Sequence, residues 1–354
     1  MLSGAEQTFV ERMPKAELHV HLEGSVRPGT LLELGARHGI AYPFSDASGA
    51  RDWYRFRDFP HFIEVYVAIC NALLTPEDIE RVTYELGEDA ARQRIRYLEV
   101  IMAPASPLNP RTPATPEVYW AGARSGATRV WRDFGVRMQF QVDGVRSRRA
   151  EDVMAVARWC AGHAGDGLIG FNLGGTELGH PASRHAAAIA YVRDAGLRVS
   201  LHAGETAGPE SVWDALEAGA ERIGHGVTSV GDPRLVEHLA KTGTVLEVSP
   251  TSNLRLGVAQ SYAAHPIRAL HDAGVAVTVN SDDPPMFGTT LTDEYLLLAE
   301  HLDFTLDELI DANLRAVRAA FLPDTERAGL GASFAAEIAG LRRDLLDGDA
   351  ATDD

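Results

Sequence analysis

The chain has 354 residues, of which 45% are hydrophobic, and this suits one large globular domain or two ordinary ones with a packed core. Its formal net charge of −17 argues against nucleic acid and anionic membranes as partners, because both attract basic faces. Two widely separated cysteines argue against a disulfide framework. No secretory or membrane-spanning segment is visible in the sequence, so we expect a cytoplasmic protein.

Short apolar runs, bounded by Gly, Asp or Asn, alternate along the chain with longer segments of helical periodicity. Such alternation is typical of βα units, in which helices cover a parallel sheet. Eight strands are predicted, at residues 16–22, 97–103, 137–143, 167–173, 197–203, 222–224, 244–249 and 275–280.

The segments between these strands carry helix start and stop signals, such as Pro233 near the start and Gly243 at the end of one of them. Eight βα units in a chain of this length predict a (β/α)8 TIM barrel, with additional helices between the first two strands and at the C-terminus. A doubly wound open sheet is the alternative. The barrel domain is expected to span residues 1–345, and residues 346–354 are expected to form an acidic, frayed tail.

Histidines and carboxylates recur near the C-terminal ends of the predicted strands, where barrel enzymes carry their chemistry. In chain order they are His19, His21, His202, Glu205, His225, Asp282 and Asp283. Any one of them alone would be better explained as a hydrogen-bonded core residue. Together they would be costly to bury without a cation. Three histidines and a carboxylate suit zinc or a similar divalent ion with an open position for water, which indicates a hydrolase.

The lysines bear on the number of metal ions. The chain contains two, Lys15 and Lys241, and neither lies at the C-terminal end of a predicted strand. No modified lysine is therefore placed to bridge two ions, and we expect a single one. Glu205 and His225 would then serve as acid and base groups, with Asp283 as an acceptor for the substrate.

Six motifs, in this order and over nearly the whole chain, resemble the adenosine deaminases of the amidohydrolase superfamily: "MPKAELHVHLEGS", "NLGGTELGHP", "LHAGETAGPESVWDAL", "AERIGHGV", "EVSPTSN" and "VNSDDPPMFG". The resemblance implies a (β/α)8 barrel, one Zn²⁺ ion, and hydrolytic replacement of a purine 6-amino group by oxygen. It also implies a set of metal ligands, namely His19, His21, His202 and Asp282.

The same resemblance implies roles around the purine, where His21 would also face the substrate. Glu205 would share a proton with N1, and His225 would orient or deprotonate the attacking water. Asp283 would bond at N7. Gly175 matches the glycine whose backbone N–H reaches N3, and its lack of a side chain would permit that approach.

Departures from the adenosine deaminase pattern concern the sugar end of the substrate. Glu23 stands where those enzymes carry the Asp near the ribose 5′ hydroxyl, so we expect Glu23 to face the sugar or a 5′ substituent; the alternative is that it only accepts hydrogen bonds from backbone N–H groups of the loop. The stretch "DFPHFIEVY" resembles relatives that act on 6-aminodeoxyfutalosine, an adenosine with a bulky 5′ acyl group. His61 in that stretch either faces the substrate or lies on a helix surface.

The predicted function is zinc-dependent deamination of adenosine or a related purine nucleoside, with 6-aminodeoxyfutalosine or adenine as the alternative substrate. A catalytically inactive nucleoside-binding relative and a different amidohydrolase chemistry are competing hypotheses. The filled ligand and proton-transfer positions argue against the first, and Glu205 with the "SDDP" pair argues against the second. The expected partner is a small purine nucleoside, and the sequence indicates no oligomeric state.

Overall fold

The computed structural model describes residues 1–104 and 115–347. Eight parallel strands follow one another around a single sheet in sequence order. They are β1 (Lys15–His21), β2 (Ile95–Met102), β3 (Arg137–Asp143), β4 (Leu168–Asn172), β5 (Arg198–Ala203), β6 (Arg222–His225), β7 (Val245–Val248) and β8 (Val277–Val279). All eight predicted strands are confirmed, and each of their ends lies within two residues of the predicted position.

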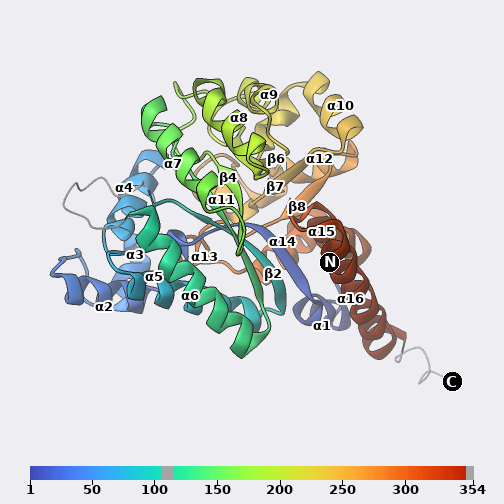
Figure 1. The fold of residues 1–354 in the computed structure, drawn as a ribbon. Coiled ribbons are helices and arrows are strands. Elements are labelled where there is room, and N and C mark those ends of the chain that lie inside the picture. Colours follow the sequence, from blue (N-terminus) through green and yellow to red (C-terminus); the bar gives the residue numbers. More distant parts are fainter. Residues whose placement is uncertain (105–114, 348–354) are drawn as a thin grey trace.

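The sheet closes where the first strand meets the segment that follows the last. Val20 of β1 forms a parallel bridge with Asp282. The backbone N–H of His21 donates to the carbonyl of Asp282 at 2.8 Å, and the N–H of Asp282 donates to the carbonyl of His19 at 3.2 Å. This closure and the sequential strand order confirm the (β/α)8 barrel and exclude the doubly wound sheet (Figure 1).

Helices that follow the strands surround the barrel (Figure 1). They are α6 (Pro116–Phe134), α7 (Ala150–Gly162), α8 (Ala186–Asp194), α9 (Pro209–Ala218), α10 (Pro233–Thr242), α12 (Ile267–Asp272), α14 (Leu291–Leu302) and α15 (Leu306–Ala319). Short helical turns fill the loops between them: η1 (Glu23–Ser25), η2 (Ala182–His185), η3 (Val227–Gly231), α11 (Pro250–Arg255), η4 (Tyr262–Ala264) and α13 (Pro284–Phe287).

The additional helices lie where the sequence predicts them. Four of them separate β1 from β2, namely α2 (Pro28–His38), α3 (Ala47–Trp53), α4 (Phe59–Cys70) and α5 (Pro76–Arg92). At the C-terminus, α16 (Asp324–Arg342) is followed by one π-helical turn, η5 (Arg343–Asp347), while α1 (Gly4–Arg12) precedes the barrel. Figure 1 shows the helices between β1 and β2 on one side of the barrel and α16 on another.

Local sequence explains where these elements begin and end. In α10, the side chain of Asp232 caps the first turn, Pro233 occupies the first helical position, and Gly243 ends the helix at a φ of 70°. Thr75 and Asp78 form a reciprocal capping box at the start of α5. Every residue of β1 is buried, because the barrel interior and the outer helices cover both faces of the strand.

A buried charge network fills part of the barrel interior. The guanidinium of Arg222 forms ion pairs with Glu99 and with Glu247. Glu247 also accepts a hydrogen bond from Nδ1 of His19 at 2.9 Å. The interior of the barrel is therefore bonded directly to a histidine that the sequence predicts as a metal ligand.

None of the helices within residues 1–104 and 115–347 is both long and apolar enough to cross a membrane. The predicted acidic tail lies outside the described residues from position 348 onward. The division into a barrel domain at residues 1–345 and a tail therefore stays a prediction.

Candidate active site

The predicted histidines and carboxylates converge at the C-terminal end of the barrel. His19 and His21 come from the end of β1, His202 from β5, and His225 from the end of β6, while Asp282 follows β8. All five side chains are buried. His225 and Asp282 have φ angles of 63° and 64°, a region that residues other than glycine rarely adopt. Such backbone strain is concentrated at functional sites, where the surrounding structure enforces it.

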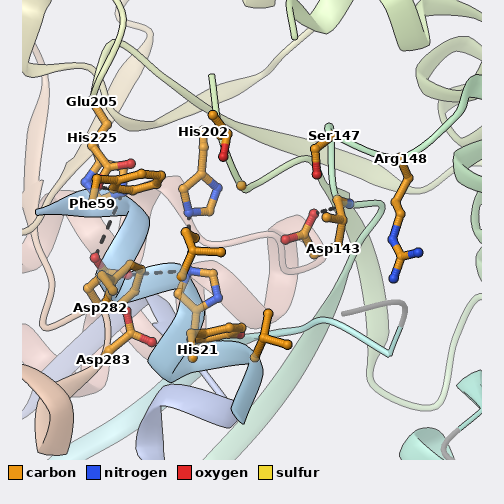
Figure 2. A pocket seen from close by; sticks show the side chains of 17 residues that line it. His21, Phe59, Asp143, Ser147, Arg148, His202, Glu205, His225, Asp282 and Asp283 are labelled. Carbon is orange, nitrogen blue, oxygen red and sulfur yellow. Dashed lines mark hydrogen bonds and ion pairs between the residues drawn. The ribbon is translucent and has the colours of Figure 1, made fainter. Parts of the chain in front are cut away.

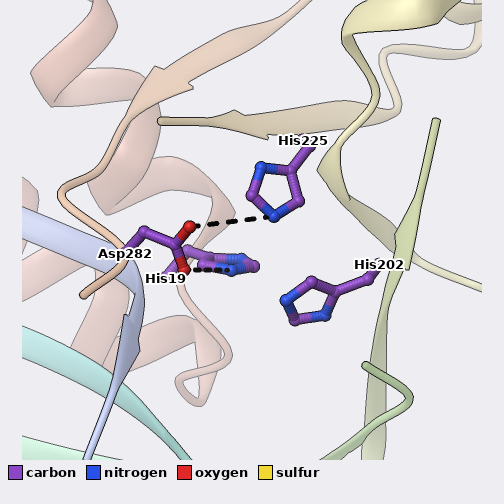
Figure 3. A group of neighbouring side chains, drawn as sticks. All are labelled: His19, His202, His225 and Asp282. Carbon is purple, nitrogen blue, oxygen red and sulfur yellow. Dashed lines mark ion pairs between the residues drawn. The ribbon is translucent and has the colours of Figure 1, made fainter. Parts of the chain in front are cut away.

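Their polar atoms lie within a few ångströms of one another. Nε2 of His21 is 3.2 Å from Nε2 of His202 and 3.4 Å from Oδ1 of Asp282. Nε2 of His19 is 3.5 Å from the same Oδ1. One group whose ligand atoms all lie within 4.8 Å of one another consists of His19, His202, His225 and Asp282 (Figure 3). The group thus contains His225, whereas the resemblance to adenosine deaminases assigns His21 as the third histidine ligand beside His19 and His202. Which of the two histidines binds the metal stays a prediction.

The hydrogen bonds of two of these histidines suit metal ligation. Nδ1 of His19 is bonded to the carboxylate of Glu247, and Nδ1 of His202 lies 2.7 Å from Oδ1 of Asn172. Because these oxygen atoms are acceptors, each Nδ1 carries a hydrogen, and Nε2 is the nitrogen of each ring that is available to a cation at the cluster. Nε2 of His19 is buried and has no hydrogen-bond partner. A divalent cation would provide this nitrogen with a partner, so the residues of the cluster are suited to binding a metal ion.

The electrostatics of the cluster also favour a cation. Burial lowers the pKa of His21 to about 3 and holds that of His202 well below its usual value, so both imidazoles are neutral and can act as ligands. Burial also acts to lower the pKa of His19, but the carboxylates of Asp282 and Glu247 outweigh it and raise this pKa to about 10, so the metal-free imidazole holds a proton that a cation would displace. The two carboxylates thus draw positive charge to the centre of the cluster.

Glu205 lies beside the cluster and is almost fully buried. Its carboxyl Oε1 is 3.8 Å from Nε2 of His225. Burial, followed by the charges of Asp282 and Glu177, raises the pKa of Glu205 well above its usual value. A carboxyl group of this kind keeps its proton to a higher pH than an ordinary glutamate does and can donate it to a substrate.

The backbone around Glu205 is held by a residue that the sequence analysis did not identify. The buried carboxylate of Glu177 accepts hydrogen bonds from the backbone N–H groups of Gly204, Glu205 and Thr206, each at 2.8 Å. It also accepts one from the hydroxyl of Ser211. Three consecutive amides bound to one carboxylate fix the loop that carries Glu205. The sequence offers no local signal for this contact, because Glu177 lies in a different loop.

Asp283 packs against the turn that follows β1. A Cβ atom built on Gly24 would lie 1.6 Å from Oδ1 of Asp283, so only a glycine leaves room for this carboxyl group. Burial, together with the charge of Asp282, raises the pKa of Asp283 well above its usual value. The glycine of the "HLEGS" motif therefore has a steric function at the site.

Replacing Gly24 by alanine is expected to displace Asp283 and lower kcat/KM for every purine substrate by roughly 100-fold, the cost typical of a misplacement of about 1 Å. Steady-state kinetics on two substrates would measure this loss. Gly29→Ala is the matched control, because a Cβ at this exposed position in α2 meets no atom within 4 Å. Equal kinetics for both variants would show that the contact between Gly24 and Asp283 does not matter for turnover.

A pocket of about 810 Å³, part of it open to solvent, lies over the cluster (Figure 2). Seven of the predicted site residues line it: His21, Gly175, His202, Glu205, His225, Asp282 and Asp283. Gly175 has a φ of 89°, which a residue with a side chain rarely adopts. His19 does not line the pocket and lies beneath it, bonded to Glu247.

Glu23 and His61 are not among the residues that line the pocket. Glu23 is fully buried; its carboxylate accepts a hydrogen bond from the hydroxyl of Tyr66 at 2.9 Å and another from the backbone N–H of Ala103 at 2.8 Å. Nδ1 of His61 accepts a hydrogen bond from the backbone N–H of Arg57. Direct contact of either residue with a substrate stays a prediction, and Glu23 reaches the pocket wall through Tyr66.

The pocket also contains polar residues that the sequence analysis did not single out, namely Asp143, Ser147, Arg148 and Thr176. Asp143 ends β3, and its Oδ1 accepts hydrogen bonds from the backbone N–H groups of Val145 and Gly174. The rule that revealed the histidines, a polar side chain at the end of a barrel strand, would have found Asp143 as well. Apolar residues of α4 form another part of the wall: Phe59, Phe62, Ile63, Tyr66 and Val67.

A (β/α)8 barrel with a buried cluster of histidines and an aspartate at the C-terminal ends of its strands defines a metal-dependent amidohydrolase. A model of the family described as adenosine deaminase matches residues 14–336. The chain belongs to the adenosine deaminase family, as its motifs predict. It is a hydrolase that deaminates an adenine-like substrate.

Three individual proteins show which members of the superfamily the chain resembles. The chain is 38% identical over 349 residues to aminodeoxyfutalosine deaminase of Streptomyces avermitilis, covering 92% of each chain. It is 40% identical over 321 residues to adenine deaminase of Rhizobium leguminosarum bv. trifolii, covering 90% of this chain and 98% of the relative. A zinc-bound amidohydrolase from Burkholderia ambifaria superposes with a TM-score of 0.89 at 27% identity, covering 98% of this chain and 96% of that one. The two named deaminases have the activities that the sequence analysis gives as alternatives to adenosine deamination.

Proposed function

We propose that the protein catalyses hydrolytic deamination of a 5′-extended adenosine of the aminodeoxyfutalosine type. The observation that carries this proposal is the extent of the pocket. Ser147 and Arg148 line it on the side away from Asp282 (Figure 2). A free purine bound at Glu205 and Asp283 would leave this region unused. The similarity to aminodeoxyfutalosine deaminase of Streptomyces avermitilis supports the same substrate class.

One zinc ion would be held by His19, His21, His202 and Asp282. When bound, it would act as a Lewis acid that makes water nucleophilic near neutral pH. The overall reaction adds water at purine C6 and releases the 6-amino group as ammonia, which leaves a carbonyl at C6. Proton transfer and the positioning of the purine would depend on residues of the protein itself.

Glu205 would share its proton with N1 of the ring, so that attack at C6 does not leave an unshielded negative charge on the ring. His225, with its Nε2 facing Glu205, would orient the attacking water. Asp283 would bond to N7 and the backbone N–H of Gly175 to N3. Partners on both edges of the ring would hold C6 within reach of the nucleophile.

The 5′ substituent would extend toward Arg148 and the aromatic side chains of α4. A guanidinium group donates hydrogen bonds in a fixed geometry and favours an anionic or carbonyl acceptor. Apolar side chains of α4 that line the pocket would pack against the apolar part of the substituent.

Adenine is the second candidate substrate, because of the 40% identity to the adenine deaminase of Rhizobium leguminosarum bv. trifolii. A panel of adenine, adenosine, 2′-deoxyadenosine and 5′-extended adenosines, compared by kcat/KM, distinguishes the two candidates. The ultraviolet change from an adenine to a hypoxanthine chromophore reports turnover in every case. The highest kcat/KM is expected for a 5′-extended adenosine, and a higher value for adenine would refute the proposed substrate.

The variant Arg148→Ala tests the substituent end. We expect kcat/KM for 5′-extended adenosines to fall by tenfold or more, which corresponds to about 1.4 kcal/mol, while kcat/KM for adenine stays within a factor of two or so. The matched control is Arg149→Ala, because the side chain of Arg149 is 75% exposed and pairs with Asp152 outside the pocket. An equal loss with adenine and with 5′-extended substrates would show that Arg148 supports the fold rather than specificity.

A further inference from the structure

We propose that Asn253 and His265 are positioning residues that fix the tautomer of His225, so that the hydrogen of this imidazole lies on Nε2 and faces the reaction centre. Neither residue lines the pocket. The proposal rests on the role of His225 in the proposed function, but it is derived from a chain of hydrogen bonds that involves no substrate. This series of hydrogen bonds begins at the backbone amide of Ile267 and ends at His225.

The first step fixes the tautomer of His265. The backbone N–H of Ile267 donates to Nδ1 of His265 at 3.1 Å. A backbone N–H can only donate, so this Nδ1 carries no hydrogen. Burial lowers the pKa of His265 to about 4, and the neutral ring therefore has its single N–H hydrogen on Nε2.

The second step fixes the side-chain amide of Asn253. Nε2 of His265 lies 3.1 Å from Oδ1 of Asn253. Since this Nε2 carries a hydrogen, it needs an acceptor, and the amide must present its oxygen rather than its nitrogen. Asn253 is fully buried in α11, and its backbone carbonyl accepts hydrogen bonds from the N–H groups of Val258 and Ala259. These backbone hydrogen bonds fix the turn that carries the side chain, and His265 fixes the side chain itself.

The third step transfers the constraint to His225. With its oxygen bonded to His265, Asn253 directs its Nδ2 at Nδ1 of His225, 3.4 Å away. An amide nitrogen can only donate, so Nδ1 of His225 is the acceptor and the hydrogen of the neutral ring lies on Nε2. This Nε2 is 3.8 Å from Oε1 of Glu205 and 4.0 Å from Oδ2 of Asp282. His225 therefore presents an N–H to the reaction centre.

The contrast with His19 shows what this constraint achieves. Nδ1 of His19 faces the carboxylate of Glu247, which is an acceptor, and this leaves Nε2 as the nitrogen that a cation can bind. Nδ1 of His225 faces a donor, and this leaves a hydrogen on Nε2, which cannot ligate a metal. Asn253 thus prevents His225 from acting as a metal ligand, although Nε2 of His225 lies in the same cluster as the ligand atoms. The Nε2–H can instead orient a water molecule or a substrate oxygen.

The tautomer is measurable by ¹⁵N-histidine NMR on the full-length protein, both metal-free and loaded with zinc, with the His225 signals assigned by their loss in His225→Gln. In the wild type, Nδ1 of His225 is expected to carry no hydrogen. In Asn253→Asp, a nearly isosteric acceptor faces Nδ1, and this nitrogen is expected to become protonated. Turnover should then fall by tenfold or more, with zinc content retained.

Ser252→Ala is the matched control. Ser252 is the neighbour of Asn253 in α11, is equally buried, and its hydroxyl has no hydrogen-bond partner within the described residues. This variant should keep both the tautomer and the activity. If Asn253→Asp does not fold, His265→Phe removes the anchor of the amide and should give a mixture of both His225 tautomers.

A protonated Nδ1 of His225 in the wild type would overturn the proposal, and so would an unchanged tautomer in a folded Asn253→Asp or His265→Phe variant. The NMR measurement needs no substrate. An incorrect substrate assignment would therefore appear in the kinetic panel and leave the tautomer result intact.

Discussion

Replacing His202 by alanine is expected to abolish both metal binding and turnover, and replacing Asp282 by alanine should do the same. Each residue supplies one of the proposed metal ligands from a different strand end, and the loss of one ligand weakens binding and misplaces the nucleophile. His202 contributes a neutral imidazole whose other nitrogen is already bonded to Asn172. Asp282 contributes a carboxylate within 3.5 Å of two histidine nitrogens.

Elemental analysis of the purified variants, combined with the ultraviolet assay, measures both effects. His185→Ala is the matched control, because His185 is also buried but bonds to the backbone carbonyl of Arg146 instead of joining the cluster. This control should lose some thermal stability and keep its metal. Full metal occupancy with full activity in His202→Ala or Asp282→Ala would refute the ligand assignment.

The second large effect is expected for Glu205→Gln. The glutamine keeps the size of the side chain but cannot exchange a proton with the purine ring, and general acid–base groups typically contribute 10²–10⁴-fold to the rate. We therefore expect kcat to fall by about this factor while the metal content stays unchanged. The hydrogen bonds from the loop to Glu177 involve backbone amides, so this substitution should not disturb them.

The comparison variant is Glu210→Gln, because Glu210 is an exposed residue at the start of α9, a few positions along the same segment. Its activity should match the wild type. Loss of the metal in Glu205→Gln would make Glu205 a ligand and would reverse the proposed division of roles.

The sequence predicts the barrel and the composition of the cluster because both depend on local patterns. Each strand is a short apolar run, and parallel strands bring their C-terminal ends to one rim, so polar residues there are expected to meet. Asp143 obeys the same rule at the end of β3 and lines the pocket, although it was not singled out.

Contacts between separate loops could not be predicted in this way. Glu23 directly follows the β1 histidines, but its carboxylate bonds to Tyr66 and Ala103, which belong to other segments. Likewise, Glu177 binds the loop that carries Glu205. The direction of a side chain in a turn depends on the packing of distant elements, and a single sequence does not specify that packing.

The seam of the barrel links metal binding to the order of folding. His19 and His21 lie on the first strand, and the backbone of Asp282, just after the last strand, bonds to both of them. A nascent chain that lacks its final βα unit has therefore formed neither the ring nor the complete set of ligands. If an ion is held by His19, His21 and Asp282 as proposed, its full set of ligands is complete only after closure, and the ion would then join the two ends of the sheet. Opening the barrel at this seam would in that case weaken metal binding.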